Sequence, residues 1–269
     1  MSLILLGFLG LLLLTQPAVA QRRVVSLDQC ADQYVMALVP RDQIAGVSHR
    51  ADDADSHFAA KASGLRFVRP SADSLLRAGV TDVVRSWGGD ARLLASLRRH
   101  GVRVHALDYV TDLDRARAEL VRIADLLDST DRARPLLTAF DQSRARYRGA
   151  LSGQTALYYT PSGFTSGEGS FVDALMREAG LTNLEPLAKF HPLGPERVLT
   201  ARPDLYVLGF YDDTYRMRRA AGRHPLVLNH IQRARHVALP GRLLGCPAWF
   251  AVEALKRMAE VGTVKEKRL

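Results

Sequence analysis

Residues 111–149 have the sequence TDLDRARAELVRIADLLDSTDRARPLLTAFDQSRARYRG. The stretch is rich in charge and contains no glycine before its last residue. Its first part repeats apolar residues at three- and four-residue steps: Leu113, Ala116, Leu120, Ile123 and Leu127. This spacing predicts an amphipathic helix, because such residues fall on one helical face. Thr111 and Asp114 have the spacing of a capping box at the start of this helix.

A turn-forming run, Asp128-Ser129-Thr130-Asp131, is expected to end the first helix. A second helix then continues to about Arg148, with these predicted buried positions: Leu136, Leu137, Phe140 and Tyr147. Pro135 is compatible with it only near the first turn. At 1.5 Å per residue the second helix spans roughly 27 Å. The two helices are either an ordinary pair on the surface or, as we expect, include a helix over residues 131–149 that connects two parts of the chain. The reason is that similar sequence patterns lie on both sides of it.

The first twenty residues are predicted to be a secretory signal peptide. Leu3–Leu14 is apolar or small throughout, and its length of about twelve residues is too short for the ~20 residues of a membrane span. Ala18-Val19-Ala20 is an A-x-A cleavage signal before Gln21, although no Lys or Arg precedes the apolar run. No later segment is apolar enough to cross a bilayer. We therefore expect a soluble, exported protein.

Net charge and cysteine content limit the partners of the chain. The whole net charge of +9 lies outside residues 1–20, which hold no charged side chain. Many arginines follow helical patterns, which is typical of a solvated face, although the charge also suits an anionic ligand. An exported chain without a recognised nucleic-acid module is not expected to bind nucleic acid. Cys30 and Cys246 lie far apart in the sequence, and an oxidising compartment permits one disulfide between them.

The order of strand and helix patterns on each side of the connector predicts two lobes. Residues 21–130 alternate short apolar strands with helices, and residues 150–262 repeat this alternation before a charged tail, 263–269. Such alternation is typical of a parallel sheet with helices on its faces. The helix and strand of residues 73–84 are echoed by residues 196–207. The predicted fold is therefore α/β: two lobes, each a mainly parallel sheet flanked by helices, joined by one long rigid α-helix.

Several segments, taken in order, resemble the class III periplasmic binding proteins, most closely their vitamin B12-binding members. The segments are Val24–Leu27, the helix and strand around Asp73, Trp87–Gly89, Phe164–Gly167 and the segment around Glu196. Such proteins serve ABC importers of vitamin B12, ferric siderophores and haem. The resemblance implies a periplasmic monomer without a cofactor that captures a metal chelate in a largely preformed cleft. It would deliver this chelate, cobalamin-like first and ferric siderophore or haem second, to an importer permease and its ATPase.

The resemblance also assigns a role to two acidic residues. In the family, an acid on each lobe docks onto basic pockets of the permease, and Asp73 and Glu196 match those positions. The alternative is that each acid complements the N-terminal dipole of its own helix. The family usually has glutamate in the first lobe, and Asp73 is shorter by one methylene.

The ligand is expected at loops that follow the carboxyl ends of strands, as in open α/β sheets. Trp87 matches an aromatic residue that contacts the corrin ring in the B12 binder, and Phe164 is expected in the equivalent loop of the second lobe. Aromatic faces suit a flat tetrapyrrole, although packing in the core is the alternative for each. The loop after the last strand adds Trp249 as a further candidate contact.

Two further candidates lie in polar segments of the second lobe. His191 occupies the segment where the B12 binder carries a tryptophan, and it either offers a nitrogen to a metal centre or lies exposed. Tyr215 belongs to a basic aromatic run: Tyr211, Tyr215, Arg216, Arg218 and Arg219. A solvated helix face is the simpler interpretation of this run, whereas in the cleft it would suit an anionic ferric siderophore.

Both cysteines fall in loops expected to face the cleft, one in each lobe. As a disulfide, Cys30 and Cys246 would tether the lobes; as free thiols they would ligate a soft metal; or they are two unrelated, partly buried thiols. The histidines lack the spacing of a zinc site, so no protein metal site is expected.

No catalytic motif is present that would predict an enzyme. The sequence has no Gly-x-Ser-x-Gly elbow, and no P-loop or Rossmann fingerprint follows a predicted strand. A periplasmic sensor or interaction module of the same fold is the second class of hypothesis. A permease and an ATPase encoded beside the gene would favour the importer-associated binding protein.

Overall fold

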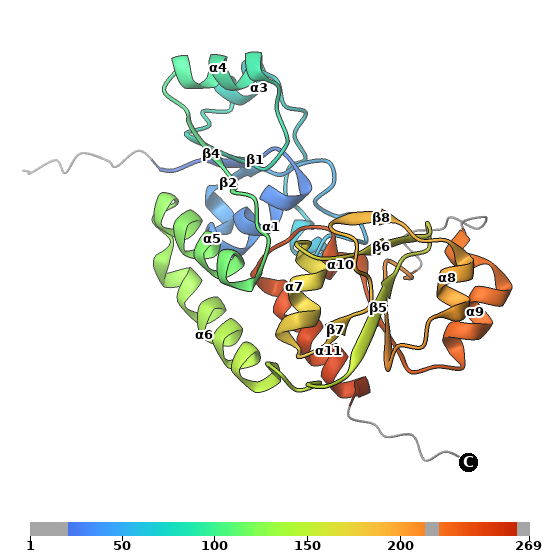
Figure 1. The fold of residues 1–269 in the computed structure, drawn as a ribbon. Helices are drawn as coiled ribbons and strands as arrows, with labels where there is room; N and C mark the ends of the chain where they lie inside the picture. Colours follow the sequence, from blue (N-terminus) through green and yellow to red (C-terminus); the bar gives the residue numbers. More distant parts are fainter. Residues whose placement is uncertain (1–20, 213–220, 263–269) are drawn as a thin grey trace, which may run out of the picture.

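The computed structural model describes residues 21–212 and 221–262, and it contains two four-stranded parallel sheets (Figure 1). The first has the order β2-β1-β3-β4, from β1 (Val24–Ser26), β2 (Ile44–Gly46), β3 (Asp82–Arg85) and β4 (Arg103–Ala106). The second has the order β7-β5-β9-β10, from β5 (Thr155–Tyr159), β7 (Thr182–Asn183), β9 (Leu205–Gly209) and β10 (His236–Leu239). The two sheets therefore share one topology, in which β5 corresponds to β1 and β9 to β3.

Helices cover both faces of the first sheet. These helices are α1 (Gln29–Leu38), η1 (Arg41–Gln43), α2 (Ala59–Ala62), α3 (Ala72–Arg77), α4 (Ala91–Arg99) and α5 (Leu113–Leu126). Alternate strand residues separate the two layers. Val24 and Val84 belong to the core with α1 and α5, whereas Val25 and Val83 belong to the core with α3 and α4. Figure 1 shows α3 and α4 on the outer side of this sheet.

The second sheet is covered in the same way. Its helices are α7 (Phe171–Glu178), α8 (Pro195–Thr200), η2 (Ala221–Arg223), α9 (Pro225–Gln232), α10 (Gly241–Leu244), η3 (Trp249–Val252) and α11 (Glu253–Gly262). Ala156 and Tyr158 face the core with α7 and α11, whereas Leu157 and Tyr159 face α8 and α9. A two-stranded antiparallel hairpin, β6 (Phe164–Ser166) with β8 (Phe190–Pro192), follows the carboxyl end of β5.

The two helices predicted from residues 111–149 are present, as α5 and α6 (Thr130–Tyr147). The prediction of the cap was wrong: the N-cap of α5 is Asp112, whose carboxylate accepts from the Arg115 amide at 2.8 Å. Asp128 between the helices has φ +50°, the left-handed conformation that turns the chain. Pro135 is the sixth residue of α6, beyond the first turn, so the helix lacks one backbone hydrogen bond there.

The connector α6 packs against elements of both halves of the chain. It lies against α5 and α1 of the first half and against α11 and η3 of the second. Arg144 links the halves directly, because its guanidinium pairs with Asp114 of α5 and, at 2.7 Å, with Glu178 of α7. One continuous hydrophobic core includes residues of both sheets, such as Val24 and Ala156. The boundaries 21–130, 131–149 and 150–262 stay predictions, but the shared core shows that the lobes are not packed independently.

Of the helices in the described part of the chain, none has both the length and the apolar character needed to span a bilayer.

Candidate ligand-binding cleft

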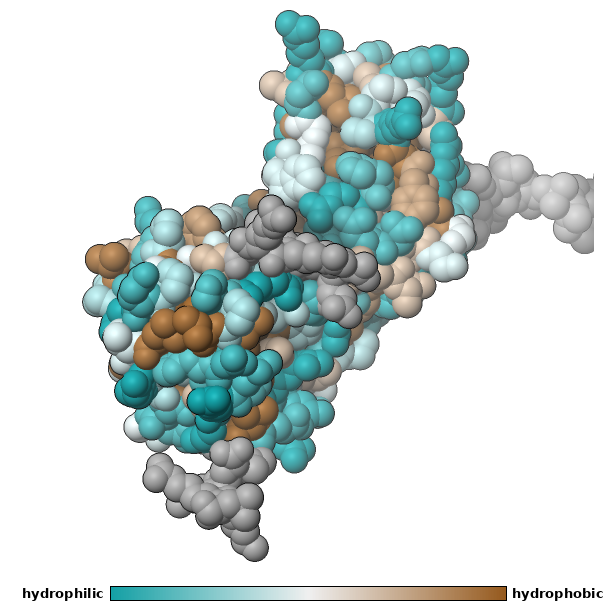
Figure 2. Space-filling model, turned by 90° about the vertical axis from the view of Figure 1, so that its right-hand side faces the viewer, coloured by the Kyte–Doolittle hydropathy of each residue, from teal (hydrophilic) through white to brown (hydrophobic). Residues whose placement is uncertain are grey.

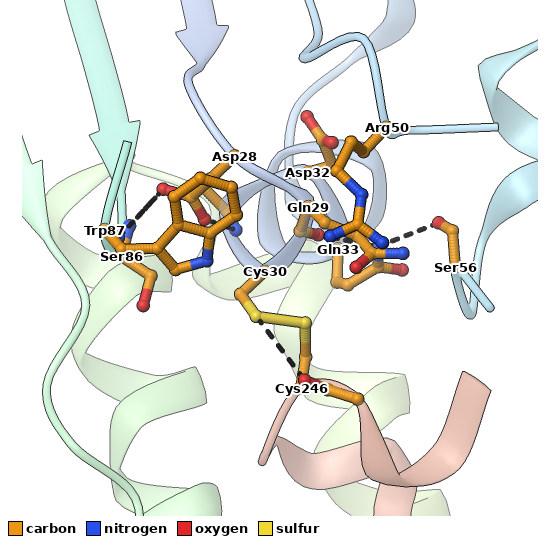
Figure 3. Close-up of a disulfide and its surroundings, with 12 residues drawn as sticks. Asp28, Gln29, Cys30, Asp32, Gln33, Arg50, Ser56, Ser86, Trp87 and Cys246 are labelled. Atoms are coloured by element: carbon orange, nitrogen blue, oxygen red, sulfur yellow. Dashed lines mark hydrogen bonds between the residues drawn. A yellow bond between two sulfur atoms is a disulfide. The ribbon is translucent and has the colours of Figure 1, made fainter. Parts of the chain in front are cut away.

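A disulfide marks the place where the carboxyl edges of the two sheets meet. Cys30 is the second residue of α1, which follows β1, and Cys246 follows α10 shortly after β10. The structure joins them, with their Cα atoms 5.3 Å apart (Figure 3). Since ligands of open α/β sheets bind beyond the carboxyl ends of the strands, the space beside this bridge is the candidate cleft. Figure 2 shows the two lobes as two masses that meet at an angle.

Trp87 lies on this edge of the first sheet, in the turn after β3. Its side chain is 57% exposed, so it is not packed in the core. The turn is held by Asp28, whose buried carboxylate accepts hydrogen bonds from three consecutive backbone amides: Ser86 at 2.7 Å, Trp87 at 3.1 Å and Gly88 at 2.8 Å. A Cβ at Gly88 would lie 2.4 Å from the carbonyl oxygen of Leu27, so only glycine fits there.

The loop after β2 forms another part of the same edge, and buried polar bonds fasten it to α1. Gln29 donates to Asp55 at 2.7 Å, and Gln33 donates to Ser56 at 2.9 Å. Asp32 accepts from the Ser48 hydroxyl at 2.6 Å and from Ser26. Burial raises the pKa of Asp32, and the hydrogen bonds from both serines oppose this rise. The bonds make the loop a fixed wall rather than a flexible flap.

On the second lobe, the β6–β8 hairpin presents an aromatic pair. The rings of Phe164 and Phe190 stack with centroids 5.0 Å apart and planes 9° from parallel. They are diagonal neighbours across the two strands, within reach of large side chains. Phe190 is 55% exposed. The expected equivalence of Phe164 to Trp87 is wrong, because β5 corresponds to β1; the residue that follows β9 as Trp87 follows β3 is Tyr211.

His191 follows Phe190 in β8 and lies opposite Thr165 of β6. Its Nε2 is 3.4 Å from a carboxylate oxygen of buried Glu185, and its Nδ1 is 3.3 Å from the carbonyl oxygen of Lys189. The side chain is mostly buried and faces protein groups. A contact between His191 and a ligand stays a prediction.

The assignment of Trp249 to the ligand site is corrected by its burial. Its side chain is 4% exposed and meets Tyr34 of α1 edge-on at 4.9 Å. The next residue, Phe250, stacks on the imidazole of His57 at 4.1 Å, so η3 packs directly on the first half of the chain. Burial, followed by the charges of Arg242 and Lys61, lowers the pKa of His57 to about 4. Trp249 is thus a packing residue between the lobes.

Tyr215 and the arginines 216, 218 and 219 lie outside the described residues. The described end of the predicted basic aromatic run is Tyr211, whose hydroxyl donates to the carbonyl oxygen of Gly222 at 2.9 Å. The guanidinium of Arg223 lies over the Tyr211 ring at 5.7 Å. Burial raises the pKa of the Tyr211 phenol well above its ordinary value.

The two acids expected to dock onto a permease occupy equivalent positions. Asp73 lies in the first turn of α3, which leads to β3, and Glu196 lies in the first turn of α8, which leads to β9. Both are exposed. Asp73 also pairs with Arg77, whose Nε lies 2.9 Å from Oδ1, and this hydrogen bond lowers the pKa of Asp73. Docking therefore has to displace or include Arg77, and it stays a prediction.

Within residues 21–212 and 221–262, no group of three or more His, Cys, Asp or Glu side chains is arranged to hold a metal ion. The disulfide also removes the two thiols as soft-metal ligands.

A cavity of about 620 Å³ lies at the opposite, amino edge of the first sheet and is lined in part by Arg22, Thr81 and Arg103. Its charges are already balanced: buried Asp82 accepts from Arg103 and from His105 at 2.8 Å each. Burial would raise the pKa of Asp82, but hydrogen bonds from His105, Arg103 and Thr81 lower it to about 2. This cluster stabilises the sheet and is not the candidate ligand site.

Sequence reasoning missed two residues that shape the cleft. Asp28 directly follows a strand and precedes a helix, so the N-cap pattern was available to identify it. Phe190 stands beside His191 in the sequence, but its pairing with Phe164 depends on the hairpin, which no turn signal predicts. Tyr109, which follows β4 on the same edge as Trp87, is 82% exposed and is a further aromatic residue of this region.

No family model matches the sequence, and no curated protein sequence is significantly similar to it. The fold is similar to that of the periplasmic heme-binding protein HutB of Vibrio cholerae, with a TM-score of 0.70 and 18% identity over 90% of this chain and 99% of that one. The periplasmic heme-binding protein RhuT from Roseiflexus sp. RS-1 is similar with a TM-score of 0.69 and 21% identity, over 90% of this chain and 98% of that one. The periplasmic vitamin B12 binding protein BtuF of Vibrio cholerae is similar with a TM-score of 0.64 and 17% identity, over 92% of this chain and 98% of that one. The chain therefore has the two-lobed fold of the class III periplasmic binding proteins.

Proposed function

We propose that this chain is the solute-binding protein of an ABC importer and that it holds a metal chelate, cobalamin-like first, between its two lobes in the periplasm. The observation that carries the proposal is Trp87, a large aromatic side chain that is 57% exposed on a turn with a fixed backbone at the carboxyl edge of the first sheet. Exposed aromatic faces bury much apolar area on binding and lose little conformational entropy, which suits a flat macrocycle. The names of the fold neighbours, heme and vitamin B12 binding proteins, support this ligand class.

The packing between the lobes supports capture by a largely preformed cleft. The disulfide, the shared core and the contact of His57 with Phe250 all join the two halves. A cleft whose walls are fixed before binding avoids the cost of ordering them. We therefore expect open and closed forms to differ little, and the affinity to depend on complementarity of the walls rather than on lobe closure.

Fluorescence titration tests the proposal. Purified protein without residues 1–20 is titrated with cyanocobalamin, haemin and several ferric siderophores while tryptophan emission is followed. Saturable quenching by one of these chelates is expected, since a chromophore over Trp87 would quench it. If none of them quenches the folded protein saturably, the ligand class is wrong.

Two variants assign the binding to the cleft. Trp87→Ala should weaken binding of the chelate by about fivefold to 150-fold, because stacking on one large aromatic residue accounts for roughly 1–3 kcal/mol. Phe67→Ala is the matched control, because Phe67 is also an exposed aromatic residue but lies by α3 on the outer side of the first sheet. Equal affinities of wild type and Trp87→Ala would remove the proposed stacking.

The same titration separates the alternatives for the ligand. Haem is the first alternative, because HutB and RhuT are named as heme-binding. A ferric siderophore is the second, and it would draw on the basic run that begins at Tyr211. A protein that binds none of these chelates and whose gene has no permease or ATPase beside it would instead fit a periplasmic sensor or interaction module.

Docking onto the importer is proposed to use Asp73 and Glu196. The pair is tested with Asp73→Asn and Glu196→Gln by measuring co-purification with the permease encoded beside the gene. Either change should weaken the complex, whereas Asp131→Asn should not, although Asp131 is likewise an exposed acid in the first turn of a helix. Unchanged co-purification of both test variants would mean that these acids serve only their own helices.

A further inference from the structure

One carboxylate ties the start of α1 to the turn that carries Trp87. Oδ1 of Asp28 caps α1 by accepting from the Ala31 amide at 3.0 Å. Oδ2 accepts from the amides of Ser86, Trp87 and Gly88. Asp28 is 1% exposed. The buried carboxylate thus accepts four amide hydrogen bonds: one through Oδ1, which caps α1, and three through Oδ2, which hold the turn.

The turn is also held from its other side. Arg85 Nε donates to the carbonyl oxygen of Gly88 at 2.6 Å, so both the amide and the carbonyl of Gly88 are engaged. Gly88 lies against Leu27, with no room for a Cβ, and Gly89 has φ +81°. The backbone on either side of Trp87 is thus fixed, although the indole itself is mostly exposed. Figure 3 shows this turn and the disulfide on the same side of the start of α1.

The geometry points to Asp28 as the positioning residue for ligand capture: it holds the Trp87 turn so that the indole is in place before the ligand arrives. This inference rests on the proposed function of the cleft. Charge-assisted bonds from a carboxylate to backbone amides are strong and directional, and three of them converge on one oxygen. An exposed aromatic residue on a fixed backbone binds without the entropic cost of ordering its turn.

The test separates the two tasks of the carboxylate. Asp28→Ser keeps one side-chain oxygen, which is enough to cap a helix but not to reach the turn as well. Asp112→Ser is the matched control, because Asp112 caps α5 by the same bond to the third following residue and is not bonded to the Trp87 turn. Both are made in a Trp249→Phe background, where Trp87 is the only tryptophan, since the sequence has two.

The first measurement needs no ligand. Time-resolved anisotropy of Trp87 should show a larger fast component in Asp28→Ser, because the turn has lost the acceptor of its three amides. The control Asp112→Ser should match the parent. Equal anisotropy decays in Asp28→Ser and Asp112→Ser would overturn the inference, whether or not the protein binds a chelate.

The second measurement shows whether Asp28 acts through Trp87. Affinity is measured with cyanocobalamin and with haemin, using absorbance so that Trp87 is not needed as a probe. Asp28→Ser should weaken binding of the chelate that the wild type binds about tenfold, but less than about twofold when Trp87 is already alanine. An equal loss in both backgrounds would show that Asp28 acts through general structure and would overturn the positioning role. If the wild type binds neither probe, the proposed function fails, and the anisotropy still decides whether Asp28 positions the turn.

A second variant covers the case in which Asp28→Ser does not fold. Arg85→Gln removes the bond to the Gly88 carbonyl oxygen, and Arg85 is only partly buried. It should increase the fast anisotropy component of Trp87 in the same direction. An unchanged decay in Arg85→Gln would show that the turn is not held by these bonds.

Discussion

Replacing Cys30 and Cys246 with alanine should cost much of the stability of the protein. The bridge closes a loop of 216 residues, the sequence separation of the two cysteines. Loop closure of that length lowers the entropy of the unfolded chain enough to stabilise the native state by about 5 kcal/mol at 25 °C. Domains commonly have a free energy of unfolding of only 5–15 kcal/mol. The double variant is therefore expected to be marginal or, at worst, unfolded at physiological temperature.

Chemical denaturation of the wild type and of the variants measures this loss. Both single variants, Cys30→Ala and Cys246→Ala, also lack the bridge, so they should be destabilised nearly as much as the double variant. If packing of the cysteines rather than the bridge were the main contribution to stability, Cys246→Ala would lower the free energy of unfolding more than Cys30→Ala, because Cys246 is 6% exposed and Cys30 is only partly buried.

Two results would refute this reasoning. Thiol counting of the wild type under denaturing, non-reducing conditions should find no free thiol; two free thiols would rule out the bridge. With the bridge confirmed, a loss below about 1 kcal/mol in the double variant would show that it does not constrain the unfolded chain as loop-closure entropy requires.

Three further predictions follow from buried side chains. The pKa of His57 is lowered to about 4, against about 6.5 in the unfolded chain. The free energy of unfolding should therefore fall by at most about 3 kcal/mol as the pH drops from 6.5 to 4, because in this range only the unfolded state takes up the proton. Urea unfolding at pH 7 and pH 4.5 should show this fall in the wild type and in the exposed-site control His100→Gln, but less of it in His57→Gln. Asp82→Asn should lower the free energy of unfolding by about 3 kcal/mol, since it leaves arginines without their buried partner, and an unchanged urea midpoint would contradict the ion-pair argument. Trp249→Ala should lower the free energy of unfolding by about 4 kcal/mol and Trp87→Ala by less than about 0.5 kcal/mol. Thermal unfolding of both variants measures this difference, and similar losses would contradict the burial of Trp249 and the exposure of Trp87.

Local patterns in the sequence were sufficient for the elements that organise the fold. The apolar spacing from Leu113 to Leu127 and the turn residues around Asp128 predicted two helices, and both are present. The echo of residues 73–84 in residues 196–207 corresponds to α3 with β3 and α8 with β9, which hold matching places in the two sheets. These features depend on neighbours in the chain, which is why a single sequence reveals them.

The remaining features depend on contacts between distant residues. Phe164–Ser166 was predicted to be a loop, and a three-residue strand has no periodicity of its own; it is a strand because it pairs with Phe190–Pro192. Trp249 follows a turn-like segment and was assigned to the ligand, whereas Tyr34, more than two hundred residues earlier, buries it. Trp87 is exposed rather than packed in the core, which was the alternative that the sequence left open, while its role in binding stays a prediction.

The disulfide constrains the order in which this protein can fold and be oxidised during its synthesis. Synthesis proceeds from the N-terminus, so the Cys30 thiol is present long before Cys246, near the other end of the chain, can meet it. The same delay affects the packing of Tyr34, whose partner Trp249 belongs to the last described segments. The first lobe is therefore expected to be neither oxidised nor fully packed until almost the whole chain is complete, and a fragment cut after the connector should expose both a reactive thiol and an apolar face.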